Sequence, residues 1–281
     1  MASQIFDLDG TRLEMRTTSP RFAQWVDEIL ADRRSADETS DEPLLSIVVE
    51  DDRARSGRKG FHLLYRRISA VVRTLQIGTL ARSFLAELDR IELRLRADAV
   101  HLDGAIVDVR GTAVLVPGSF VPLMAMLGHR AEREGIRLPA HTSVAVDASG
   151  RVVPSRSVVD TADALARLER LFGSTDSSDR VTVDDVVEPE VVLLLAREQG
   201  VVLRETSGGA TLHTLATRTL NLPAIGGSAL RSLGTLVERA RWYETSWAGT
   251  VRIPDVLIQA VENRPSHPYV NQRTEDTLAG R

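Results

Sequence analysis

The first 97 residues alternate short apolar strands with amphipathic helices. Stretches 4–8 and 12–17 alternate polar and apolar residues around Asp9-Gly10, a pair typical of hairpin turns. Ser19-Pro20 then begins a predicted helix, because the apolar residues that follow recur at helical spacing. Strands are expected at 44–50 and within 61–76, and a helix at 79–95. The pattern predicts a small N-terminal α/β subdomain at 1–97.

Residues 98–263 continue the alternation and are predicted to form the larger domain. Strands are expected at 105–109, 113–116, 142–147, 152–154, 200–205 and 242–247. Helices are expected at 122–134, 162–172, 189–199, 228–241 and 254–263. Strands that alternate with helices favour an α/β fold, in which helices flank a sheet. Residues 264–281 are polar and are expected to be a disordered tail.

Composition excludes several classes of protein and of site. The chain has 281 residues and no cysteine, so disulfides and thiolate chemistry are excluded. A net charge of −4 gives no basis for nucleic-acid binding, and no apolar run is long enough to span a membrane. The N-terminus has no apolar signal segment, which indicates a cytoplasmic protein. Lys59 is the only lysine, so a mechanism that needs a lysine must use it.

One central segment carries a family resemblance. Residues 101–110 form a strand that begins with a histidine, and Gly111 is followed by an apolar strand, Pro117-Gly118 and a predicted helix. This segment resembles the C-terminal domain of the HPr kinase/phosphorylase family and of its relatives in peptide-modification clusters. The resemblance spans residues 74–261 and includes the hairpin at 142–154. It implies a P-loop-type sheet flanked by helices.

The phosphate-binding loop of that family is degenerate in this sequence. Gly118 takes the position of the first glycine of G-x-x-x-x-G-K-[ST], but Leu123, Met124 and Ala125 stand where the last glycine, the lysine and the hydroxyl residue belong. The loop therefore lacks the lysine charge for the phosphates and the hydroxyl that binds Mg²⁺. The family's paired acidic residues are also missing from the stretch around His141. We expect no ATP, no metal, no other cofactor and no catalytic residue.

Four residues are candidates for binding a ligand in the former nucleotide cleft. His101 matches the family's histidine before the strand, Gly118 and Ser119 lie at the loop, and His141 follows the first helix. A structural role is the alternative for both histidines, as a hydrogen-bonded side chain at a strand edge. His101, His129 and His141 lack the spacing of a metal site.

A second motif competes with this interpretation. Residues 6–11 contain Asp7-Leu8-Asp9-Gly10-Thr11, which matches the D-x-D-G-T motif of haloacid-dehalogenase-type phosphatases. In that family the first aspartate is the nucleophile and the second an acid/base. The alternative is an ordinary Asp-Gly hairpin turn.

The sequence thus predicts a non-catalytic, kinase-like binding protein that holds a peptide for partner enzymes. The resemblance implies that this peptide is the precursor of a ribosomally made, modified natural product. The alternatives are a Mg²⁺-dependent phosphatase that uses Asp7 and Asp9, a kinase with rearranged ATP contacts, or a structural subunit of a biosynthetic complex. Homodimer formation is compatible with each of these.

Overall fold

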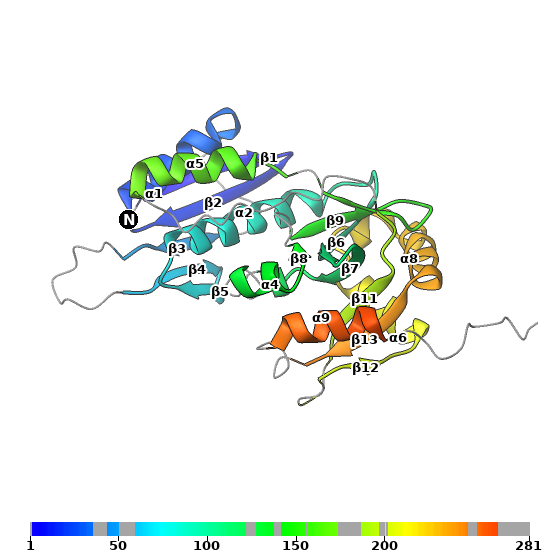
Figure 1. The fold of residues 1–281 in the computed structure, drawn as a ribbon. Helices are drawn as coiled ribbons and strands as arrows, with labels where there is room; N and C mark the ends of the chain where they lie inside the picture. Colours follow the sequence, from blue (N-terminus) through cyan, green and yellow to red (C-terminus); the bar gives the residue numbers. More distant parts are fainter. Residues whose placement is uncertain are drawn as a thin grey trace, which may run out of the picture.

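The computed structural model describes residues 2–35, 44–50, 60–121, 128–137, 142–155, 157–173, 187–196, 200, 202–246 and 252–263. These residues form two β-sheets with helices packed on them, so the predicted α/β class is confirmed (Figure 1). Among the described helices, none is long and apolar enough to cross a membrane.

The first sheet has its five strands in chain order. They are β1 (Ala2–Leu8), β2 (Thr11–Thr17), β3 (Leu45–Val48), β4 (His62–Arg66) and β5 (Ser69–Thr74). β1 and β2 form the predicted hairpin, and its turn places Asp9 and Gly10 at positive φ, 47° and 91°. β2 and β3 run parallel because helix α1 connects them.

Helix α1 (Pro20–Ile29) begins where the sequence predicts it. The Ser19 side chain accepts a hydrogen bond from the N–H of Phe22, and Pro20 occupies the first turn, where a missing N–H is harmless. Phe22 and Trp25 are fully buried and pack against Phe84 of helix α2 (Ile77–Leu93). A short 3₁₀ turn, η1 (Ala31–Arg33), follows α1.

Helix α5 (Thr161–Phe172) packs in the first core, although it follows residue 98 in the sequence. Trp25 Nε1–H donates to the carbonyl of Ala164 at 2.8 Å, and Leu168 is fully buried among residues of α1 and α2. Figure 1 shows the green helix α5 beside the blue elements of the first sheet. A boundary at residue 97 therefore separates the two sheets, but the first core also includes residues from beyond it.

The second sheet has the order β10-β9-β6-β7-β11-β13-β12, with β8 also paired to β6. Its strands are β6 (Val100–Val109), β7 (Thr112–Pro117), β8 (Ile136–Arg137), β9 (Ser143–Val146), β10 (Val152–Pro154), β11 (Val191–Leu195), β12 (Arg204–Glu205) and β13 (Arg241–Thr245). β7, β11 and β13 are parallel, so their carboxyl ends share one edge of the sheet.

Helices cover both faces of the second sheet. One face packs against α4 (Gly128–Arg133) and α9 (Ile253–Glu262). The other packs against α6 (Gly208–Thr217) and α8 (Gly227–Arg239), and α7 (Leu222–Ile225) lies between these two helices in the sequence. The result is a three-layer arrangement whose central strands are buried on both sides.

The predictions for two segments were wrong. A helix was predicted at 189–199, but 191–195 is β11, a central parallel strand. A strand buried on both faces has a continuous apolar run, which periodicity alone does not distinguish from a buried helix. No helix was predicted between residues 205 and 228, but helix α6 begins at Gly208, capped by the Ser207 hydroxyl, which accepts a hydrogen bond from Ala210 N–H.

Candidate functional site

The turn after β7 is where the sequence places the first glycine of a phosphate loop. Gly118 N–H donates to the carbonyl of Asp103 at 3.3 Å, and Val121 N–H donates to the carbonyl of Gly118 at 3.2 Å. A Cβ atom on Gly118 would lie 2.3 Å from Asp103 Oδ1 and 2.7 Å from the carbonyl oxygen of Thr142. Glycine is therefore required because two oxygen atoms approach this backbone closely. Both oxygen atoms would repel a phosphate.

The Asp103 carboxylate beside this turn pairs with an arginine of helix α2. Arg90 of α2 donates to Asp103 Oδ1 at 2.9 Å and also pairs with Glu87. Glu87 accepts in turn from Arg66 of β4 at 3.2 Å. Burial works against the charge of Arg90, but the carboxylates of Asp103 and Glu87 together hold its pKa above the ordinary value. This chain of ion pairs connects the first sheet with the Gly118 turn.

Three buried polar atoms around Asp103 have no hydrogen-bond partner in the described structure. They are Ser119 Oγ, Ser143 Oγ and Arg90 Nε. Ser119 follows Gly118 directly, and Ser143 lies opposite Asp103 in the register of β9 and β6. Buried polar atoms without a partner are uncommon, and each requires an explanation, such as a bound water or ion or local strain. The turn therefore keeps hydrogen-bonding capacity for a polar group, although it presents a carboxylate to that group.

His101 is fully engaged within the protein. It is 2% exposed, its Nδ1 lies 3.1 Å from Ser155 Oγ, and its Nε2 lies 3.1 Å from Asp98 Oδ1. The hydrogen bond with His101 lowers the pKa of Asp98. The backbone N–H of His101 donates to Oδ1 of the fully buried Asn221 at 3.0 Å. Since both ring nitrogens have partners, His101 fixes the start of β6 and offers no free nitrogen to a ligand.

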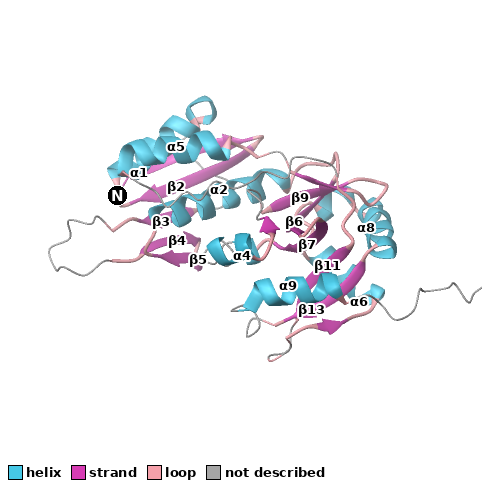
Figure 2. Cartoon of the chain, in the orientation of Figure 1, coloured by secondary structure: helices cyan, strands magenta, loops and turns pink. Residues whose placement is uncertain are grey.

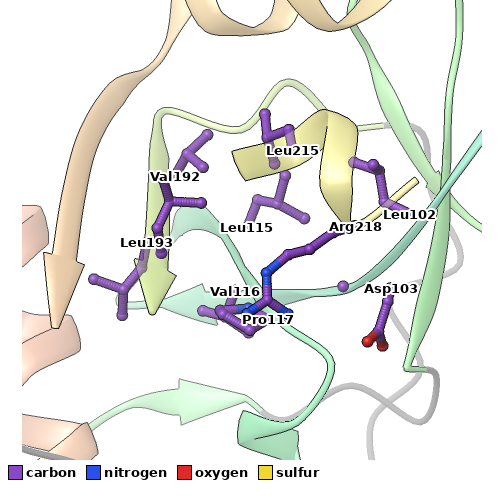
Figure 3. Close-up of a pocket in the computed structure, with 11 residues that line it drawn as sticks. Leu102, Asp103, Leu115, Val116, Pro117, Val192, Leu193, Leu215 and Arg218 are labelled. Carbon is purple, nitrogen blue, oxygen red and sulfur yellow. The ribbon is translucent and has the colours of Figure 1, made fainter. Parts of the chain in front are cut away.

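A small pocket opens at the carboxyl end of β7, on the side of α6. Its apolar walls come from β6, β7, β11 and α6, and its charged members are Asp103 and Arg218. Figure 3 shows the Arg218 side chain reaching toward Val116 and Pro117, while the Asp103 carboxylate points away from it. Within the described residues the half-buried guanidinium of Arg218 has no hydrogen bond or ion pair. It is an unpaired cation beside an apolar surface.

The competing Asp-Leu-Asp-Gly-Thr motif forms the turn of the first hairpin. Asp7 Oδ1 accepts a hydrogen bond from Gly10 N–H at 2.7 Å, and Asp9 pairs with Arg33 at 3.3 Å. β1, which carries Asp7, is an antiparallel edge strand, whereas the phosphatase motif requires a buried parallel strand. In the described ranges no group of three His, Asp or Glu side chains could hold a metal ion.

Several residues of the sequence argument lie outside the described residues. They are Lys59, Leu123, Met124, Ala125 and His141. Of the four predicted ligand-binding residues, the structure therefore describes His101, Gly118 and Ser119. Gly118 and Ser119 are adjacent at the turn, whereas the His101 ring is bound to Asp98 and Ser155.

Sequence reasoning missed the charged residues that define this site. Asp103 could have been noticed, because it is an acidic residue in the mainly apolar strand β6, which also contains His101 and Asp108. Arg90 and Arg218 carry no such signal, since Arg90 lies on α2, 13 residues before Asp103, and Arg218 follows α6, which is far from β6 in the sequence. Comparison of the chain with family models, with curated proteins and with solved structures finds no match in any of the three. The resemblance to HPr kinase/phosphorylase therefore stays a prediction.

Proposed function

We propose that this chain is a non-catalytic, kinase-like binding protein that holds a peptide for partner enzymes. The observation that carries the proposal is the Asp103 carboxylate beside Gly118. β7, the glycine turn and helical residues that begin at Phe120 follow one another there in the order of a phosphate loop, but the space at the glycine contains a carboxylate oxygen. Under this proposal the site is related to a nucleotide site but has the wrong charge for a nucleotide.

The electrostatic cost of a phosphate at this turn is large. Two unit charges 4 Å apart in a partly buried site interact by about 4 kcal/mol. The Asp103–Arg90 ion pair offsets part of this cost, but Arg90 is already shared with Glu87. The Gly118 N–H, which would face a phosphate in a working loop, donates to a carbonyl instead. These contacts favour a binding role over phosphoryl transfer.

A peptide is the ligand class that fits the remaining features. In the part of the chain that the structure describes, the hydroxyls of Ser119 and Ser143 and the guanidinium of Arg218 have no partner, and such groups suit amides and carboxylates. The resemblance to kinase relatives in peptide-modification clusters points to the precursor of a modified natural product. Under this proposal the chain presents the peptide, and the chemistry belongs to partner enzymes.

Selection from a random peptide library displayed on phage tests this proposal. We expect the full-length chain to enrich a family of related sequences, and the corresponding synthetic peptides to bind saturably in the micromolar range. If repeated selection enriches no sequence family, the peptide proposal fails. A matched selection on the Asp103→Asn variant reports whether the Gly118 turn contributes to the binding.

A further inference from the structure

The edge strands of the two sheets differ in how they are protected. The edge of β1 pairs with the chain after η1, where Ser35 N–H donates to Ile5 O at 3.0 Å. At the edge of β10, Val152 and Val187 exchange two hydrogen bonds of 2.8 Å. β12 is two residues long. In contrast, β5 has six residues, and among the described residues nothing pairs with its outer side (Figure 2).

The side chains along β5 do not block this edge. Natural proteins protect a long exposed edge with charges, proline or a bulge. The β4–β5 pair has a bulge at Leu64/Tyr65, but β5 contains a single charged residue, Arg73, and no proline. Large apolar side chains flank the strand: Ile68 at the hairpin tip is 97% exposed, and Leu75 after β5 is 51% exposed. An edge with one charge, one bulge and no proline, flanked by exposed apolar side chains, remains a surface to which an extended peptide can add a strand.

The charges around β5 are predominantly positive. Arg73 stacks on Phe61, with its guanidinium carbon 3.8 Å from the ring centroid. Arg66 pairs with Glu87, which also pairs with Arg90. Burial first, and then the positive charge of Arg66, lower the pKa of Arg94 at the end of α2. Among these residues four arginines accompany a single carboxylate, with Arg66 and Arg94 near the hairpin turn and Arg73 near the other end of β5. An acidic partner is attracted there, whereas a second copy of the chain would bring the same cations and be repelled.

We propose that the outer edge of β5 binds an extended acidic peptide as a sixth strand of the first sheet. This inference rests on the proposed peptide-binding function and adds the location and the chemistry of the ligand. Backbone hydrogen bonds to β5 supply the affinity, and the surrounding arginines select for glutamate and aspartate. The alternative location on the same molecule is the Arg218 pocket, and the experiment below separates the two.

The register of the hairpin identifies a variant that alters only the outer edge. Arg66 and Ser69 are paired in the register and flank the two-residue turn. In such a hairpin the pair that closes the turn exchanges the backbone hydrogen bonds, so the next pair, Tyr65 and Ala70, is expected to direct its backbone groups away from each other. The register shift lies beyond this pair. Ala70→Pro therefore removes a donor from the outer edge and keeps the pairing with β4. Ala70→Ser retains the N–H and is the matched control.

The probe is a short fluorescein-labelled peptide of alternating glutamate and valine, with a lysine–valine peptide as the charge control. Fluorescence anisotropy on the full chain should give saturable binding of the acidic peptide alone, weaker at high salt. Ala70→Pro should weaken binding of the acidic peptide about tenfold, because one backbone hydrogen bond between the peptide and β5 is lost. Ala70→Ser should leave the binding unchanged. Arg94→Glu should also weaken it, and Arg231→Glu on the exposed face of α8 should have no effect.

Each other outcome overturns the inference in a recognisable way. If Arg218→Ala abolishes binding and Ala70→Pro does not, the peptide binds in the pocket, and the proposed function survives without the β5 site. If both peptides bind equally, or neither binds, the edge does not recognise acidic strands. If sedimentation shows a dimer that Ala70→Pro dissociates, a second copy occupies the edge. Circular dichroism controls for folding, and Arg94→Glu gives an independent result if Ala70→Pro misfolds.

Discussion

Asp89 provides a quantitative test of how the first core is assembled. Its carboxylate accepts hydrogen bonds from Val158 N–H at 2.8 Å and from the Ser157 hydroxyl at 3.1 Å, so it fixes the chain that leads into α5. Burial raises the pKa of Asp89 from 3.8 to about 6, although both hydrogen bonds lower it. Of the neighbouring charges, Glu92 raises the pKa and Arg90 lowers it.

The direction of the effect on stability follows from the raised pKa. A rise from 3.8 to about 6 is about two units, which corresponds to about 3 kcal/mol. Because the pKa of the folded state lies above that of the unfolded state, the folded protein binds the proton more tightly. The resulting stabilisation is present in full below about pH 4 and is lost as the pH rises to about 6. Above that pH the ionised carboxylate weakens the fold.

Asp89→Asn removes the charge and keeps both hydrogen bonds. The amide oxygen accepts from Val158 N–H, and the amide NH₂ donates to the Ser157 hydroxyl. We expect the variant to match the wild type at pH 4 and to be up to about 3 kcal/mol more stable at pH 8. Urea unfolding followed by tryptophan fluorescence across this pH range measures the difference, and Asp89→Ala should be less stable than Asp89→Asn throughout. An Asn variant whose stability parallels the wild type at every pH would refute the reasoning.

Three further predictions concern Gly118 in the turn after β7, Asn221 beside His101, and Asp7 in the first hairpin. Gly118→Ala should destabilise the fold by about 1–3 kcal/mol, because its Cβ meets Asp103 Oδ1 at 2.3 Å, and a thermal midpoint equal to that of the wild type would contradict the described turn. Asn221→Ala should cost about 3 kcal/mol, since the buried amide binds the backbone of residues 96, 99 and 101; urea unfolding checks this, and a loss below about 1 kcal/mol would be inconsistent with it. Asp7→Asn should change stability by less than about 0.5 kcal/mol, because the amide oxygen still accepts from Gly10 N–H. Neither the wild type nor the Asp7→Asn variant should show Mg²⁺-dependent phosphatase activity. Activity that is present in the wild type and absent from the variant would restore the phosphatase hypothesis.

The local signals in the sequence predicted the elements that depend on local chemistry. The hairpin at Asp9-Gly10 forms because glycine at φ 91° closes the turn, and α1 begins at Ser19 because the hydroxyl caps it. β11 was mispredicted because its five aliphatic residues are buried on both faces, so they have no alternation to distinguish them from a helix. Its identity depends on β7 and β13, which lie far away in the chain.

The candidate site was predictable only where it resembles a known turn. Gly118 and Ser119 were found because they follow an apolar strand as a phosphate loop does. The contact that determines the charge of the site is the ion pair between Arg90 and Asp103. Arg90 lies on α2, which packs in the first core, and Asp103 lies on β6 of the second sheet. No residue spacing in the sequence predicts this pair. The contact depends on where the fold places the last turns of α2 relative to β6, so it becomes visible only in three dimensions. The same holds for Arg218, which the unpredicted helix α6 carries to the end of β7.

The central claim is that the Gly118 turn, with the Asp103 carboxylate beside it, does not bind a nucleotide. Calorimetric titration of the full-length chain with Mg·ATP tests it most directly. The structure predicts no heat of binding and no shift of the thermal midpoint at millimolar nucleotide. Saturable binding in the micromolar range would contradict the account, because it would require the phosphates to displace a carboxylate that Arg90 holds at 2.9 Å.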